Sequence, residues 1–173
     1  HGPFSHALEN MLMDDWHHEK LSLLLMHKMN QELGGELSVA MEMFQGKYSR
    51  KFFNQLISSQ LDVDRLDYLK RDSFYTGVSE GNVNAQRIIS MMNVADDELV
   101  IDAKGIYSIE NFLTARMFMY WQVYYHKTAA LAEHLLVKIL KRAKELTHLG
   151  VSLPASDNLE YFLNKTHFES ASE

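Results

Sequence analysis

The sequence opens on residues whose types and spacing suit acid/base chemistry. HGPFSH is followed by Glu9 and by WHHE at residues 16–19. A helix that begins at His6 places Glu9 about one turn later on the same side. A carboxylate beside an imidazole orients the ring and makes it more basic, which suits a general acid or base near neutral pH. The plainer alternative is that these histidines lie on the surface or cap a helix.

A second stretch, SSQLDVDRLDYLKRDSFYTGV at residues 58–78, is rich in aspartate and arginine. A helix that begins near Asp64 places Asp64, Tyr68 and Asp72 on one face, four residues apart. Carboxylates are hard ligands for Mg²⁺, Mn²⁺ or iron, and arginines can bind phosphate. The charged candidates are Asp62, Asp64, Asp67, Asp72, Arg65 and Arg71. The alternative is a solvated helix in which these charges pair with one another.

A third stretch, TARMFMYWQVYYHKT, carries Arg116, Tyr120 and Tyr124 at intervals of four residues, with Lys127 nearby. On a helix these side chains form one stripe. A guanidinium binds phosphate through paired hydrogen bonds, and aromatic rings stack on a base or a sugar. An aromatic stripe is more often core, but a dry core would have to satisfy the cation and the hydroxyl groups of this one.

Composition limits the chemistry further. The 173 residues include no cysteine, so any metal must be held by histidine, aspartate and glutamate. The net charge of −6 disfavours a duplex-binding surface, although a basic cluster leaves nucleic acid open as a partner. That cluster is Lys138, Lys141, Arg142 and Lys144. No apolar run approaches the ~20 residues of a membrane span and no signal-like segment opens the chain, so we expect a cytoplasmic protein without membrane contact.

Apolar spacing predicts the helices that must position these residues. Leu21, Leu24, Leu25 and Met29 give residues 14–31 an amphipathic helical pattern. Shorter helices are expected at about 37–45, 49–60, 64–73 and 84–92. Residues 108–146 lack glycine and proline and predict one very long helix, or two with a kink near His126; NLEYFLN predicts a last short helix.

One segment, ELVIDAKGIYS, has β character. Two short runs at 99–101 and 106–108 flank Asp102-Ala103-Lys104-Gly105, which suits a hairpin turn. The predicted fold is therefore all-α with one small β-hairpin near 99–108. The length suits a single domain spanning residues 1–173.

Together, the three stretches resemble the HD-domain phosphohydrolases, most closely the deoxynucleoside triphosphate triphosphohydrolase (dGTPase-like) branch. HGPFSH resembles the second half of the family motif HD-(I/L)-GHGPFSH, LDVDRLDYLKRDS its later aspartate motif, and the stripe from Arg116 to Lys127 its substrate helix. In that family the eponymous His-Asp pair and a further histidine lie upstream of such a segment. The resemblance thus implies a partial HD domain that lacks three of four metal ligands and part of the C-terminal region.

The resemblance also implies roles for individual residues. His1, His6, Glu9 and His18 would form the acid/base group around the α-phosphate, and Asp64 would be the remaining metal ligand. The substrate-binding residues would be Arg65, Tyr68, Asp72, Arg116, Tyr120 and Tyr124. The implied cofactor is a divalent metal, namely Mg, Mn or Fe, with Zn or Ni as further options. Arg65 replaces a lysine of some relatives and Tyr120 a histidine, so base and sugar preference stay open.

The implied reaction is metal-dependent hydrolysis of a deoxynucleoside triphosphate to a deoxynucleoside and inorganic triphosphate. One alternative is an HD enzyme that acts on another phosphoester, such as a nucleoside monophosphate or a cyclic dinucleotide. Another is a module that binds nucleotides without turnover. The family's habit and the methionine-rich helices predict a homo-oligomer.

Overall fold

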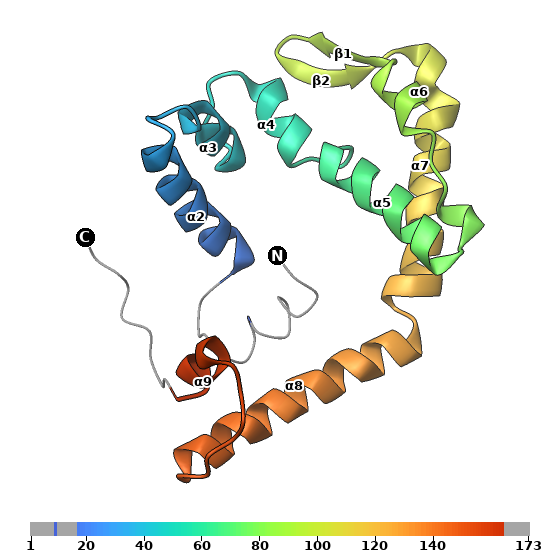
Figure 1. Ribbon diagram of the computed structural model, residues 1–173. Coiled ribbons are helices and arrows are strands. Elements are labelled where there is room, and N and C mark those ends of the chain that lie inside the picture. The colour runs from blue at the N-terminus through green and yellow to red at the C-terminus, as the bar shows by residue number, and fades with distance from the viewer. Residues whose placement is uncertain (1–8, 10–16, 165–173) are drawn as a thin grey trace. The chain divides into compact units, whose positions relative to one another are not determined.

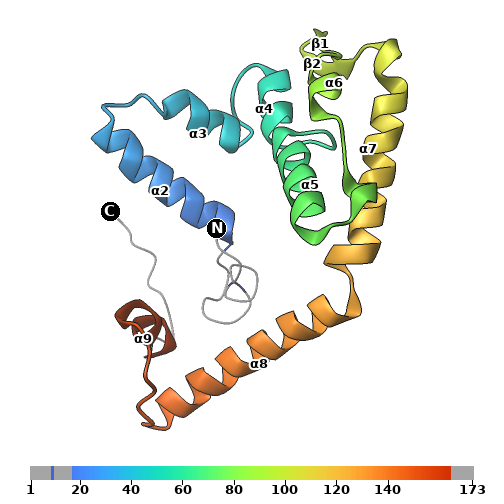
Figure 2. The ribbon, with the colours of Figure 1, turned by 45° about the vertical axis from the view of Figure 1, so that its right-hand side comes forward.

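The computed structural model describes Glu9 and residues 17–164 (Figures 1 and 2). This described part contains eight α-helices and one two-stranded antiparallel sheet, which confirms the predicted all-α fold with one small hairpin. The backbone forms two compact units, His1–Leu25 with Lys127–Glu173, and Met26–His126. No helix among the described residues is long and apolar enough to cross a membrane.

The helices follow the predicted pattern closely. They are α2 (His18–Glu32), α3 (Ser38–Phe44), α4 (Lys51–Ile57), α5 (Val63–Thr76), α6 (Ala85–Ile89), α7 (Ile106–Met119), α8 (Lys127–His148) and α9 (Asp157–Asn164). Two 3₁₀ turns, η1 (Ser79–Gly81) and η2 (Ala103–Gly105), and a π-helical segment, η3 (Tyr120–Tyr124), complete the described elements. Of the two alternatives predicted for residues 108–146, the structure shows separate helices: η3 ends at Tyr124, and α8 begins at Lys127.

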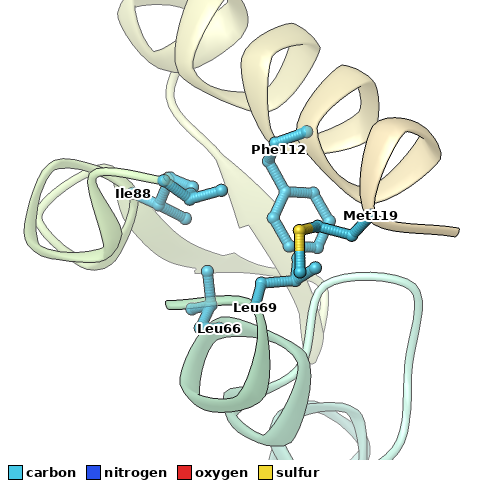
Figure 3. Close-up of a cluster of buried hydrophobic side chains, with 7 residues drawn as sticks. Leu66, Leu69, Ile88, Phe112 and Met119 are labelled. Carbon is cyan, nitrogen blue, oxygen red and sulfur yellow. The ribbon is translucent and has the colours of Figure 1, made fainter. Parts of the chain in front are cut away.

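The hydrophobic core of the unit Met26–His126 lies where α5, α6 and α7 meet (Figure 3). Leu66 and Leu69 of α5 face Phe112 and Met119 of α7, and Ile88 of α6 closes the cluster. Phe112, Leu69 and Met119 have no exposed surface, and burying each such side chain contributes about 1.5–3 kcal/mol. The core therefore holds α5 and α7 against each other, and Tyr68 and Tyr124 of the candidate site pack against it.

Local sequence sets both ends of α5. The Asp62 side chain caps its N-terminus by accepting a hydrogen bond from the backbone N–H of Arg65. Gly77 ends the helix with φ of 72°, a left-handed conformation that glycine adopts without a steric penalty. The stretch at residues 58–78 thus contains both the residue that caps the start of this helix and the glycine that ends it.

The position of the hairpin differs from the prediction. The strands are β1 (Met92–Ala95) and β2 (Glu98–Ile101), so the turn is Asp96-Asp97; the predicted turn residues Ala103–Gly105 form η2, and 106–108 begin α7. Asp96 and Asp97 have positive φ, which aspartate tolerates better than most residues. Asp97 is held there by Arg50 Nε and the Lys51 N–H, both 2.8 Å away, and the Arg50 bond is the main cause that lowers its pKa.

The predicted amphipathic segment 14–31 corresponds to α2, but residues 14–16 lie outside the described part. No residue of α2 is buried, and its apolar residues Leu24 and Leu25 are 51% and 63% exposed. The apolar pattern therefore identified a helix here without identifying a buried face.

Candidate active site

Asp62, the first aspartate of the motif LDVDRLDYLKRDS, has a structural role at the start of α5. Asp62 is buried, and its carboxylate accepts hydrogen bonds from the backbone N–H groups of Ser59 and Arg65 and pairs with the Arg65 guanidinium. Arg65 also donates from Nη1 to the Ser59 carbonyl at 2.6 Å. Asp62 is therefore fully occupied, which argues against it as a metal ligand.

Asp64, two residues later, has a different environment. Its side chain is exposed on the first turn of α5, and none of the described residues donates to it or pairs with it. Asp67, by contrast, pairs with Arg71 at 2.5 Å on the surface. Asp64 thus keeps a carboxylate of the hard-oxygen type that Mg²⁺, Mn²⁺ or Fe²⁺ prefers. Within the described residues, no three acidic or histidine side chains group closely enough to hold a metal.

Tyr68 and Asp72, on the same helix, meet the stripe from the end of α7. The Tyr124 hydroxyl donates to Asp72 Oδ2 at 2.7 Å, and the rings of Tyr68 and Tyr124 meet edge to face with centroids 6.0 Å apart. Burial raises the pKa of the Tyr124 phenol well above its usual value, and the hydrogen bond to Asp72 raises it further. Tyr124 therefore stays protonated at neutral pH and acts as a donor.

Arg116 lies at the head of the stripe. Its Cζ is 5.6 Å from the ring centroid of Tyr120, a cation–π distance, and its Nη1 donates to Gln60 Oε1 at 3.3 Å. Burial and the neighbouring Tyr120 raise the pKa of Tyr68, whereas the charge of Arg116 opposes that shift. Arg116 thus lies close enough to both phenols to interact with them electrostatically.

The π-helical segment η3 carries both tyrosines of the stripe, Tyr120 and Tyr124. The backbone N–H of Tyr125 donates to the Tyr120 carbonyl at 2.8 Å, the i to i+5 bond of a π turn. The Tyr120 and Tyr124 rings lie 5.2 Å apart. Such segments are rare and occur often at functional sites, because they turn side chains away from regular helical positions.

The six predicted substrate-binding residues therefore all come from α5 and from α7 with η3. Tyr68, Asp72, Arg116, Tyr120 and Tyr124 form one connected group, and Arg65 lies at its edge, facing Asp62 and Ser59. Gln60 also contacts this group, through Arg116, although the sequence pattern did not predict it as a site residue. Its contact to Arg116 joins residues 56 positions apart, which no local spacing reveals.

Two of the predicted acid/base residues, Glu9 and His18, are described, and they belong to the other unit. Glu9 Oε1 lies 2.5 Å from His18 Nδ1 and accepts the backbone N–H of His18 at 2.6 Å. The carboxylate therefore fixes the orientation of that imidazole. His1 and His6 lie outside the described residues.

A groove of about 530 Å³ lies along a different face of α5. It is lined by Asp67, Lys70, Arg71, Ser73, Phe74, Tyr75, Ser79 and Asn82. None of the six predicted substrate-binding residues lines this groove.

Known proteins resemble this chain in sequence and in fold. Residues 83–160 match the family model described as the HD associated region. The chain is 42% identical over 158 residues to the uncharacterized protein YwfO of Bacillus subtilis, and this match covers 87% of this chain and 36% of YwfO. It is 28% identical over 177 residues to a deoxynucleoside triphosphate triphosphohydrolase SAMHD1 homolog of Dictyostelium discoideum, and this match covers 92% of this chain and 33% of the homolog.

A solved structure is similar to this chain in both sequence and fold. The crystal structure of a phosphohydrolase from Bacteroides thetaiotaomicron is 57% identical in sequence and superimposes with a TM-score of 0.93, over 96% of this chain and 41% of the other. The chain thus spans about a third to two fifths of the length of these relatives. Its sequence and fold are similar to those of HD-domain phosphohydrolases, and residues 83–160 match the region associated with that domain.

Proposed function

We propose that this chain is part of a metal-dependent hydrolase that converts deoxynucleoside triphosphates to deoxynucleosides and inorganic triphosphate. The observation that carries the proposal is the group of Arg116, Tyr68, Tyr120, Tyr124 and Asp72, which offers one cation, several phenols and one carboxylate. The similarity to the Dictyostelium triphosphohydrolase homolog supports the substrate class, and the Bacteroides phosphohydrolase supports the reaction class.

Arg116 is the proposed phosphate-binding residue of this group. Its guanidinium can form paired hydrogen bonds to phosphoryl oxygens, and stacking on Tyr120 limits its conformations. Arg65 is proposed to contribute less, because Asp62 already balances its charge.

Tyr68, Tyr124 and Asp72 are the proposed sugar-binding residues. The Tyr124 hydroxyl donates a hydrogen bond to Asp72 Oδ2, and no described residue donates to Asp72 Oδ1. Oδ1 can therefore accept a hydrogen bond from a sugar hydroxyl. A tyrosine packed under the ring would disfavour a 2′-hydroxyl, which would give a preference for deoxy substrates.

The acid/base group is proposed to be His1, His6, Glu9 and His18, with His6 as the acid that protonates the departing 5′ oxygen. Glu9 contacts His18 at Nδ1 and so orients this imidazole. A divalent metal bound in part by Asp64 would supply charge stabilisation at the phosphate and an activated water.

Substitution of Asp64 tests the metal assignment. In a form extended upstream through the expected His-Asp pair, Asp64→Ala should reduce dNTP turnover by at least about 10³-fold, because a hard-oxygen ligand is lost. Asp102→Ala, which removes another exposed carboxylate of the same unit, should leave turnover unchanged. Retained turnover in Asp64→Ala would exclude Asp64 from the metal site.

A further inference from the structure

The turn before α5 contacts both arginines of the candidate site through consecutive residues. The Ser59 carbonyl accepts from Arg65 Nη1 at 2.6 Å, and Gln60 Oε1 accepts from Arg116 Nη1 at 3.3 Å. Two guanidinium groups on separate helices are thus held by two adjacent positions of one short segment.

The two arginines differ in how their charge is balanced. Arg65 pairs with the buried carboxylate of Asp62. Arg116 has no carboxylate partner among the described residues. Its contacts there include the Gln60 amide, the ring of Tyr120 and the hydroxyl groups of Tyr68 and Tyr120. The positive charge of Arg116 therefore remains available to an anion, whereas that of Arg65 is compensated inside the protein.

We propose that Gln60 is a positioning residue for Arg116, holding the guanidinium against Tyr120 through a neutral acceptor that leaves its charge for the substrate's phosphates. This inference rests on the proposed function. A carboxylate at position 60 would hold Arg116 equally well but would cancel its charge and repel phosphate. An amide holds the guanidinium in the same position without cancelling its charge. The residue type at position 60 therefore sets how strongly the site attracts an anion.

The test compares three variants of the upstream-extended form in steady-state dNTP hydrolysis. Gln60→Glu should raise KM about tenfold or more with kcat within about twofold, because it weakens phosphate binding without touching the reacting atoms. Gln60→Ala should raise KM only about two- to fourfold, since Arg116 becomes less ordered but keeps its charge. Gln86→Glu, an exposed residue of α6, makes the same charge change elsewhere and should leave both constants unchanged.

Ionic strength provides a second readout. The KM difference between Gln60→Glu and the unsubstituted protein should shrink as salt is raised, because a screened charge repels phosphate less. A purely structural defect would not depend on salt in this way.

The outcomes separate the inference from the proposed function. If the unsubstituted protein hydrolyses dNTPs but Gln60→Glu leaves KM within twofold or acts no more strongly than Gln60→Ala, the role of Gln60 is wrong and the function stands. If the unsubstituted protein hydrolyses no dNTP, the proposed function is wrong and the inference falls with it.

Discussion

At the scale of single residues, one short segment shows aspartate in four environments. Asp62 is buried as a helix cap, Asp64 is exposed and unpaired among the described residues, Asp67 pairs with Arg71, and Asp72 accepts from Tyr124. The spacing predicted that Asp64 and Asp72 share a face but did not separate a cap from a metal ligand. Burial and partners make that distinction, because a carboxylate that already accepts several hydrogen bonds has little capacity left for a metal.

Asp62 should be far more important to stability than its surface neighbour. Asp62→Ala removes the helix cap and leaves the Arg65 charge unpaired, so we expect the free energy of unfolding to fall by about 2–3 kcal/mol. Asp67→Ala removes only an exposed ion pair and should cost less than about 1 kcal/mol. Urea denaturation followed by circular dichroism measures both, and equal losses for the two variants would contradict the capping role.

At the scale of elements, the site depends on how closely η1 approaches α7. A Cβ atom at Gly81 would overlap Met119 Sδ and lie 2.7 Å from its Cγ, and Met119 is fully buried. Position 81 therefore requires glycine because Met119 lies too close to leave room for a side chain, and not because of the φ angle of Gly81. That approach packs the end of α5 against the helix that carries Arg116.

Gly81→Ala should destabilise the protein by about 1–3 kcal/mol through overpacking against Met119. In a Met119→Ala background the same change should cost much less, because space is then available and the two effects are coupled. Gly46→Ala is the matched control: Gly46 has φ of 67° and no atom within 4 Å, so its cost of about 1 kcal/mol should not depend on Met119. Strictly additive losses for Gly81→Ala and Met119→Ala would refute the steric explanation.

The sequence predicted the helices better than the hairpin, and the reason is physical. Helix positions followed from apolar spacing and from breakers such as Gly34-Gly35 and Gly77. The turn signal at Asp102 to Gly105 was misleading, because Gly105 is needed for close packing: a Cβ there would lie 2.7 Å from Ile101 Cγ2. The true turn, Asp96-Asp97, depends on a long-range contact with Arg50, which local sequence does not show.

The same distinction applies to the candidate site. The i, i+4 spacing of Arg116, Tyr120 and Tyr124 predicted one stripe, and the structure brings that stripe together with Tyr68 and Asp72. The roles of Gln60 and Asp62 depend on tertiary contacts and on burial. Residue types on one helix could thus be predicted, whereas partners from other segments could not.

At the scale of the whole molecule, the chain corresponds to one part of longer relatives. It spans about a third to two fifths of the relatives' lengths, and in the resembling family the His-Asp pair lies upstream of the segment that HGPFSH resembles. We therefore predict that this chain binds substrate and that catalysis also needs the upstream ligands.

The most direct test incubates this chain and the upstream-extended form with each dNTP and Mg²⁺ or Mn²⁺, with the products separated by ion-exchange chromatography. A panel of nucleoside monophosphates and cyclic dinucleotides serves as the comparison. We expect that only the extended form releases deoxynucleoside and inorganic triphosphate. Hydrolysis of the comparison panel instead, or saturable dNTP binding without any turnover by the extended form, would contradict the proposed function.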